Sequence, residues 1–351
     1  MTDVGQLRNY SLPNRCKPSI MIETSIDMST YSVSQPAESL TLEHLRTRLI
    51  NLAPTLEKMA TNLPRWNADY EDVTSTPLKL IGFLCKDSPE DVDKACRGYI
   101  SFCQTFDDKQ REFVSKERYA ETDFGSVNEQ VYQNLEYMSD IYYPALLFSY
   151  LFSSNYFAIY RAFRNSFIPL CQSLSGATLE VGIGHGLLSA SLLSVNPRLT
   201  GYGLDISPAA PEISSRVSSF FRLAHPITTT VGDAVANIPI QSETPYRVMI
   251  CAEVLEHLSD PARLLRNMHS KLEDEGLLFL TASINMESVD HLYLFHSDQE
   301  VVQMVQECGF RLLCCELAFL TVQPYRDNPK IIERLRKMAN PATVILIAAK
   351  N

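Results

Sequence analysis

Short apolar runs alternate with segments of helical periodicity through the second half of the chain. The apolar runs lie at residues 179–181, 199–204, 247–252 and 277–282, and a β-prone run covers residues 225–231. A leucine-rich helical pattern covers residues 187–193, and a second helix is expected from Asp260 and Pro261 to Leu272, before a turn at Gly276. Strands that alternate with helices form a parallel sheet with helices on both faces, so the pattern predicts a Rossmann-like, doubly wound α/β fold.

The first part of the chain divides into an aperiodic arm and a helical region. Residues 1–38 are rich in Ser, Thr and Pro, which predicts a mobile arm. The pattern then becomes helical, and further helices are expected near residues 78–84, 89–106 and 127–137. The first helix places on one face Leu42, Leu45, Leu49 and Leu52. We expect residues 39–164 to form a helical lid and substrate region, which could also provide the surface of a homodimer.

The stretch between the two parts, residues 137–167, holds the densest group of aromatic side chains. At helical spacing, aromatic residues mostly pack as core between helices and a sheet. Phenol and guanidinium groups beside an apolar pocket could instead orient a small polar substrate. The candidate substrate-binding residues are Tyr156, Tyr160, Arg161 and Arg164. For the two arginines, a solvated face near a helix end is the simpler alternative.

A glycine-rich turn follows the first apolar run of the second half, with the sequence Glu180-Val181-Gly182-Ile183-Gly184-His185-Gly186. Glycines let the backbone turn tightly and approach a ligand closely. Asp205, which ends the next run and is followed by Ile206, can accept both hydroxyls of a ribose. An anionic Glu180 would repel the pyrophosphate of NAD, but it suits an ammonium and a sulfonium. These residues favour S-adenosylmethionine as the cofactor, with Asp233 and Ala234 at its adenine.

Four motifs, in this order, resemble those of the class I S-adenosylmethionine-dependent methyltransferases. They are Glu-x-Gly-x-Gly-x-Gly, the acid after the second strand, Gly-Asp-Ala at 232–234 and Glu-Val-Leu-Glu-His-Leu at 253–258. The resemblance covers about residues 165–351, and it implies a sheet of seven strands, a methyltransferase activity and a cofactor contact at Glu253. A Rossmann-like domain without a nucleotide is the alternative.

The catalytic groups are expected at the carboxyl end of the fourth strand, because open α/β sheets bind ligands there. Glu253, Glu256 and His257 follow that strand, and His257 could act as a general base with a pKa near the working pH. A second polar group, at 283–296, follows the fifth strand and includes Asp290, His291 and His296. We expect His257 and His296 to converge on the acceptor, with Glu256 as a further catalytic residue.

The same carboxylates and histidines could hold a divalent metal ion. The segment is similar to that of small-RNA 2′-O-methyltransferases, in which Glu-x-x-Glu-His and a later histidine bind a metal. It is also similar to that of ubiquinone-pathway O-methyltransferases, which carry a near-identical Glu-His segment. In many related enzymes the segment only closes the cofactor pocket, so the sequence leaves both the base and the metal ligand open for His257.

The helical front half, the aromatic connector and the histidine pair together look like a small-molecule C-methyltransferase of specialised metabolism. They are similar to the bacterial 2-oxo acid methyltransferases of the 2-ketoarginine type, which implies C-methylation of a 2-oxo acid. One alternative is O- or N-methylation of a small phenol, acid or amine. Another is a cyclase, in which the amine of S-adenosylmethionine attacks its own chain to form azetidine-2-carboxylate.

The composition narrows the partners of the chain. A net charge of −10 implies no strong basic face, which argues against a nucleic-acid substrate. The sequence has no apolar run of about eighteen residues and no basic-then-apolar start, so neither a membrane span nor a secretory signal is expected. The nine cysteines follow no zinc spacing, and Cys251, Cys314 and Cys315 are expected to be reduced and buried in strands. We therefore expect a cytoplasmic enzyme with a small-molecule substrate.

Overall fold

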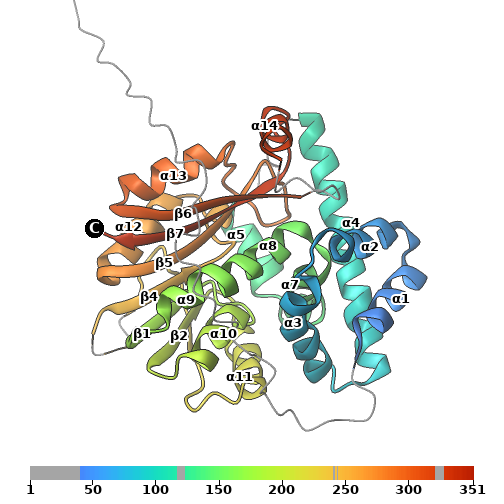
Figure 1. Cartoon of the computed structure of the whole chain (residues 1–351), viewed down its shortest axis with the longest axis horizontal. Coiled ribbons are helices and arrows are strands. Elements are labelled where there is room, and N and C mark those ends of the chain that lie inside the picture. Colours follow the sequence, from blue (N-terminus) through green and yellow to red (C-terminus); the bar gives the residue numbers. More distant parts are fainter. Residues whose placement is uncertain (1–39, 117–122, 240–241, 243, 321–327) are drawn as a thin grey trace, which may run out of the picture.

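The structure is a computed structural model that describes residues 40–116, 123–239, 242, 244–320 and 328–351. The predicted mobile arm, residues 1–38, lies outside the described residues. Seven strands form one sheet in the order β3-β2-β1-β4-β5-β7-β6 (Figure 1). They are β1 Gly176–Val181, β2 Leu199–Asp205, β3 Thr228–Val231, β4 Tyr246–Cys251, β5 Leu272–Ile284, β6 Phe310–Phe319 and β7 Ala342–Lys350. The predicted α/β fold class is confirmed.

The strand order reverses between β1 and β4, which fixes where a ligand can bind. Strands β1 to β5 pair in parallel, whereas β7 pairs antiparallel with both β5 and β6. In a doubly wound sheet the loops after two adjacent strands diverge at such a reversal and leave a crevice at the carboxyl ends. The glycine turn follows β1 and the Glu253–Leu258 segment follows β4, so both border this crevice.

Helices cover both faces of the sheet, and the strand side chains alternate between two cores. In β4, Val248 and Ile250 belong to one core, whereas Met249 and Cys251 belong to the other, as the period of a strand requires. The first face is covered by α8 Ser154–Ala162, α9 Ile168–Cys171, α10 Leu187–Val195 and α11 Ala210–Phe220. The second face is covered by α12 Pro261–Lys271 and α13 Asp298–Glu307. Amphipathic α14, Pro329–Lys337, packs on the ends of β6 and β7.

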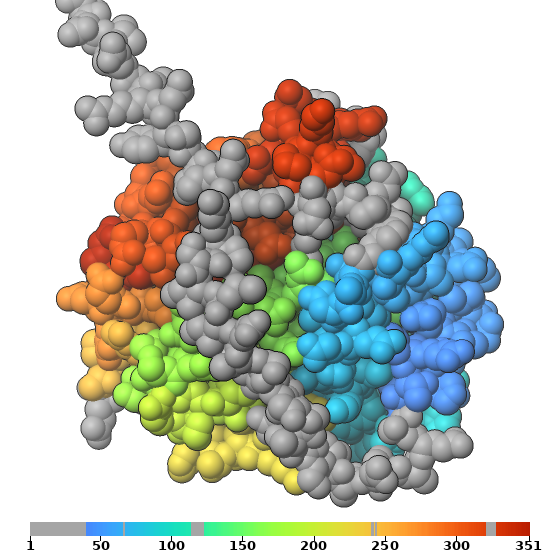
Figure 2. All heavy atoms as spheres, in the orientation of Figure 1, coloured from blue at the N-terminus to red at the C-terminus, as the bar shows by residue number. Residues whose placement is uncertain are grey.

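Most of the N-terminal helices continue the core of the first face, and a smaller apolar cluster, which includes Val127, Tyr132 and Tyr143, reaches Ala209 beside the sheet. The N-terminal helices are α1 Leu42–Leu52, η2 Pro54–Leu56, α2 Glu57–Trp66, α3 Tyr70–Leu84, α4 Pro89–Lys116, α5 Phe124–Val127, η3 Asn128–Tyr132, α6 Leu135–Tyr137, η4 Met138–Tyr142 and α7 Tyr143–Phe152. Helix α7 packs against both α3 and α4, and one apolar cluster runs from Leu45 of α1 to Phe279 of β5. In the space-filling view the blue N-terminal helices lie directly against the green helices that cover the sheet (Figure 2).

Several details differ from the sequence-based expectations. Leu52 ends α1 and is 42% exposed, so only two of the four leucines on the predicted face are fully buried. The helix expected at 127–137 is broken by Asn134, whose side chain caps the next turn by accepting from the Tyr137 amide. Gly276 lies inside β5, in a bulge opposite β4, rather than in a turn before the strand. Cys314 and Cys315 are only half-buried, because they lie on β6 at the edge of the sheet.

An aromatic cluster joins the sheet to the segment that follows α8. The ring of Phe279 in β5 lies 5.0 Å from that of Phe163 and 5.3 Å from that of Phe167, centroid to centroid, and all three are fully buried. Phe279→Ala is expected to lower the free energy of unfolding by about 3–5 kcal/mol, because it removes buried area and leaves a cavity. Denaturant titration measures this loss. Met338→Ala, at a side chain that is 61% exposed, is the control and should change stability little.

None of the helices within the described residues combines the length and the apolar character that a membrane crossing requires.

Candidate active site

A cavity of about 670 Å³ opens at the carboxyl ends of β1, β2 and β4 and extends beneath the N-terminal helices. Its sheet end is lined by the glycine turn, Asp205 and the Glu253–Leu258 segment. Its other end is lined by apolar side chains from α2, α4, α5 and α7, among them Met59, Phe102, Phe124 and Leu146. The volume lies within the range of about 300–1,000 Å³ that is usual for ligand pockets, so a cofactor and a small acceptor can share it.

The glycine turn needs glycine for two separate reasons. Gly182, Gly184 and Gly186 have φ angles of 67°, 51° and 77°, which lie in the left-handed region that side chains with a Cβ rarely adopt. A Cβ on Gly182 would also lie 2.4 Å from Cγ2 of Val254, which leaves no room for it. Gly182 and Gly184 line the cavity, whereas Gly186 ends the turn as the N-cap of α10.

Glu180 is the buried acid at the end of β1. One of its oxygens accepts a hydrogen bond from the Ser189 amide at 3.0 Å, and the residue is only 4% exposed. Burial raises the pKa of Glu180 to about 7, and the nearby Asp205 adds to the rise. Ionisation of a buried carboxyl is unfavourable in the empty site, and a cationic ligand stabilises the ionised form. This agrees with the expected position of Glu180 beside the ammonium or sulfonium of the cofactor.

Lowering the pH from about 8 to about 6 should therefore weaken the binding of S-adenosylmethionine, because Glu180 becomes protonated and loses its attraction for a cation. Calorimetric titration at several pH values measures the trend. Glu180→Gln should weaken binding at pH 8 and make the pH dependence shallower, whereas Glu212→Gln, at an exposed position on α11, should do neither. An unchanged pH profile in Glu180→Gln would remove this residue from the cofactor site.

The part of the cavity beside the ends of β2 and β3 contains further residues predicted for the cofactor. Asp205 accepts one hydrogen bond on each oxygen, from the amides of Gly184 and Ser207, both at 2.8 Å. Each oxygen keeps a second lone pair, so a ribose can still be bound. Asp233 accepts from the Val235 amide with one oxygen and is otherwise exposed toward the cavity. Ile206 and Ala234 also line the cavity.

Glu253 follows β4 in a left-handed conformation, with a φ of 54°. Its carboxyl accepts hydrogen bonds from the hydroxyls of Thr281, at 2.7 Å, and Ser283, at 2.8 Å. Burial, followed by the charge of Glu256, raises the pKa of Glu253 to about 8. Strained backbone and a perturbed acid at the end of a strand are typical of functional sites.

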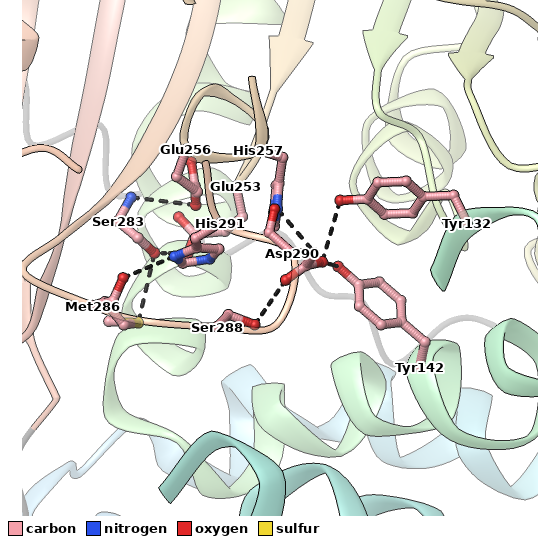
Figure 3. A network of polar contacts seen from close by, with 10 residues as sticks. All are labelled: Tyr132, Tyr142, Glu253, Glu256, His257, Ser283, Met286, Ser288, Asp290 and His291. Atoms are coloured by element: carbon pink, nitrogen blue, oxygen red, sulfur yellow. Dashed lines mark hydrogen bonds and ion pairs between the residues drawn. The ribbon is translucent and has the colours of Figure 1, made fainter. Parts of the chain in front are cut away.

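A network of polar contacts surrounds His257, which ends the short helix η6 Leu255–His257 (Figure 3). His257 Nδ1 lies 3.0 Å from the carbonyl oxygen of Asp290 and 3.4 Å from the Oδ2 of the same residue. A carbonyl can only accept, so Nδ1 carries the proton and Nε2 is left as the basic nitrogen. Burial alone would lower the pKa of His257, but Asp290 and then Glu256 outweigh it and raise the pKa.

Asp290 is held by side chains of the N-terminal region. Its Oδ2 accepts hydrogen bonds from the hydroxyls of Tyr132, at 3.2 Å, and Tyr142, at 3.0 Å, and its Oδ1 accepts from Ser288 (Figure 3). Burial would raise the pKa of Asp290, but the neighbouring histidines and these donors lower it, so the carboxylate stays ionised. An ionised acid of fixed orientation beside an imidazole positions that imidazole and stabilises its protonated form.

His291 and Glu256 complete the site. The His291 ring lies 4.9 Å from that of His257, and its Nδ1 is 2.8 Å from the carbonyl of Met286. Burial, followed by the charge of His257, lowers the pKa of His291, so this ring is neutral near pH 7. Glu256 is fully buried, and its Oε2 has no hydrogen-bond partner among the described residues. Ligand atoms of Glu256, His257 and His291 lie within 4.8 Å of one another.

The structure corrects two groups of predicted site residues. His296 is exposed and outside the cavity, and the histidine that faces His257 is His291. Arg161 and Arg164 also lie outside the cavity, because their shared helix face points toward α3 and they form ion pairs there with Asp69 and Asp72.

The two candidate substrate-binding tyrosines also differ in whether they line the cavity. Tyr156 lines the cavity, and its role in binding the substrate stays a prediction. Tyr160 does not line it, because its hydroxyl bonds to that of Ser191 inside the core. The sequence reasoning also missed Tyr132, whose only signal is its place near the aromatic stretch.

Comparison with known proteins agrees with this geometry. Residues 152–314 match the family model for a methyltransferase domain. A ubiquinone biosynthesis O-methyltransferase from Pseudoalteromonas translucida is 27% identical over 135 residues, which are 37% of this chain and 52% of that protein. The enzyme of the same name from Proteus mirabilis is 30% identical over 127 residues, which are 36% of this chain and 49% of that protein. The chain thus spans about half the length of the curated relatives it matches.

Among solved structures, an O-methyltransferase from a trans-AT polyketide synthase of Brevibacillus brevis, in complex with S-adenosyl-L-homocysteine, is similar to this chain. The identity is 15%, the match covers 53% of this chain and 71% of that one, and the TM-score is 0.42. The family match over residues 152–314, the strand order and the glycine turn after β1 together indicate the class I S-adenosylmethionine-dependent methyltransferase fold.

Proposed function

We propose that this chain transfers the methyl group of S-adenosylmethionine to a hydroxyl oxygen of an uncharged small molecule, with His257 as the general base. The observation that carries the proposal is the pair of His257 and Asp290 beside the cofactor residues, inside one cavity with them. Nε2 of His257 takes the proton of the acceptor hydroxyl, while the oxygen attacks the methyl carbon in line with the bond to sulfur. The carbon–sulfur bond breaks, its electron pair stays on sulfur, and Asp290 stabilises the protonated imidazole.

The lining of the cavity favours an acceptor without negative charge. Its acidic side chains are Asp107, Glu180, Asp205, Asp233, Glu253, Glu256 and Asp290. Among the described lining residues, Lys58 is the single lysine or arginine, and it is exposed. An anionic acceptor would therefore be repelled over most of the cavity.

The same argument weakens the expectation of a 2-oxo acid. Arg161 and Arg164, the candidate substrate-binding arginines that could have paired with its carboxylate, form ion pairs outside the cavity. A hydroxylated aromatic or aliphatic compound suits the apolar end better. The curated relatives carry the name of O-methyltransferases, which agrees with transfer to oxygen.

An acceptor screen by mass spectrometry tests the proposal. The full chain is incubated with S-adenosylmethionine and with matched sets of uncharged phenols and alcohols, 2-oxo acids and amines. Methylated phenols or alcohols, together with S-adenosylhomocysteine, are the expected products. Methylation confined to 2-oxo acid carbons or to amines would contradict it, and methylthioadenosine formed without an acceptor would point to the cyclase instead.

A divalent metal ion at Glu256, His257 and His291 is a second candidate for how the acceptor is activated. The unpartnered Oε2 of buried Glu256 favours it, together with the proximity of the three ligand groups. Two imidazoles and one carboxylate suit zinc or another first-row divalent metal, and a bound metal would lower the pKa of a hydroxyl that it contacts. The carbonyls of Asp290 and Met286 already orient the two rings through Nδ1, as the outer contacts of metal ligands do.

Chelation distinguishes the two candidates. If His257 acts as a free base, dialysis against a chelator should leave turnover unchanged, and His291→Ala should have a modest effect. If a metal is required, chelation should abolish turnover, added divalent ion should restore it, and Glu256→Gln and His291→Ala should both behave as the chelated protein does.

A further inference from the structure

Tyr143, the first residue of α7, lies against the glycine turn from the side of the N-terminal helices. Its ring is 2% exposed and lines the cavity. A Cβ built on Gly184 would lie 3.7 Å from the Tyr143 ring, so the tyrosine stands beside the turn with little space between them. Tyr143 precedes residues 152–314, the part of the chain that matches the methyltransferase family model.

The hydroxyl of Tyr143 is buried and has no hydrogen-bond partner within the described part of the chain. Other tyrosines here do bond: buried Tyr132 and half-buried Tyr142 to Asp290, and buried Tyr70 and Tyr160 to the Leu151 carbonyl and to Ser191. Ser207 lies beside Tyr143, but no hydrogen bond of normal length joins their hydroxyls, and the Ser207 hydroxyl instead donates to the Tyr132 carbonyl and accepts from the Ala209 amide. A buried polar atom without a hydrogen-bond partner lowers the stability of a protein. Because this hydroxyl lies in a ligand cavity, we expect an atom of the ligand to be its partner.

The ligand atom must be an acceptor. Burial, followed by the charge of Asp205, raises the pKa of Tyr143, so the phenol keeps its proton and can donate. S-adenosylmethionine has one anionic group, its carboxylate, and that group needs donors in a cavity whose charged side chains are mostly acids. The amides of the three glycines in the turn are already used: Gly182 donates to Leu204, Gly184 to Asp205 and Gly186 to Ile183.

We infer that Tyr143 donates a hydrogen bond to the carboxylate of S-adenosylmethionine, so that the N-terminal helical region forms part of the cofactor site. The inference rests on the proposed function, because it requires this cofactor. It assigns to the helices a role beyond covering the cavity: their position decides whether the amino-acid end of the cofactor is bound.

Tyr143→Phe tests the inference, because it removes only the hydroxyl. By calorimetric titration of the full chain, the dissociation constant for S-adenosylmethionine should rise about tenfold to a hundredfold, the range for a lost hydrogen bond to a charged group. The thermal midpoint of the ligand-free protein should not fall, since the hydroxyl has no partner to lose. Methylthioadenosine, which has the nucleoside and lacks the amino acid, should bind both proteins equally.

Tyr160→Phe is the matched control. It removes a hydroxyl that bonds to Ser191, so it should lower the thermal midpoint and leave the affinity for S-adenosylmethionine unchanged.

Two outcomes would overturn the inference alone: equal affinity of wild type and Tyr143→Phe for S-adenosylmethionine, or an equal loss of affinity for methylthioadenosine, which would place the contact at the nucleoside. If the wild-type chain binds no S-adenosylmethionine, the proposed function fails and the inference fails with it.

Discussion

Replacement of His257 by alanine is expected to lower the turnover number on the order of a hundredfold or more, while the affinity for S-adenosylmethionine stays nearly unchanged. The imidazole is held by Asp290 on one nitrogen and presents the other as a base, so its loss removes the group that accepts the proton. Cofactor affinity is spared because the proposed cofactor contacts come from the glycine turn, Asp205 and Asp233.

The chain offers a matched control for this experiment. His296 is a histidine of the same polar segment as His291, but it is exposed and outside the cavity, so His296→Ala should keep full turnover. Asp290→Asn should give an intermediate loss, because Asn can retain a hydrogen bond with the ring but cannot stabilise its positive charge. Full activity of His257→Ala would exclude this histidine from the mechanism and shift attention to Glu256 and the tyrosines.

The sheet could be predicted from the sequence because its signals are local. Strands β1, β2 and β4 are short, mostly apolar runs that end at glycine or an acid, and the run expected at 247–252 matches β4 to within one residue. The bulge at Gly276 could not be predicted in the same way, since it depends on how β5 pairs with β4, which residues 272–276 do not encode by themselves.

The cofactor side of the site was predictable for a related reason. Parallel strands all end at one edge, so the residues that follow β1, β2 and β4 must meet there, as Gly182, Asp205 and Glu253 do. The acceptor side depends on which neighbour each helix face contacts. Arg161 and Arg164 share a face as their spacing requires, but only the packing of α3 shows that the face points away from the cavity.

His291 and His296 illustrate the same limit in a loop. Both belong to an irregular segment after β5, in which no periodicity tells which side chain points inward. Backbone hydrogen bonds decide which of the two histidines points inward. The amides of Leu292 and Tyr293 donate to the Glu256 carbonyl, which holds this part of the loop beside η6 and leaves His296 at the surface.

A fragment that begins at Phe167 is expected to be insoluble or unfolded. The first face of the sheet, which includes Val248, Ile250 and Phe279, shares one continuous apolar core with the helices of residues 42–171. Deletion of residues 1–166 would remove most of the helices that cover this face. The apolar surface exposed in this way would be far larger than the apolar patches on soluble monomeric proteins. Soluble yield, circular dichroism and sedimentation of the fragment beside the full chain measure the effect.

A longer fragment, which begins at Tyr143, sharpens the test. It keeps α7 and α8, and with them Phe163 beside Phe279, but it loses α3 and α4, against which α7 packs. Leu147, Phe148 and Leu151 are buried in the full chain, and in this fragment they would lose that cover. We therefore expect it to aggregate as well, and to show no binding of S-adenosylmethionine. A soluble, folded fragment from either start would mean that the deleted helices are a separable domain, and it would contradict the shared core. Only the fragment from Phe167 lacks Tyr143, so only its binding of the cofactor with the affinity of the full chain would also contradict the role inferred for that tyrosine.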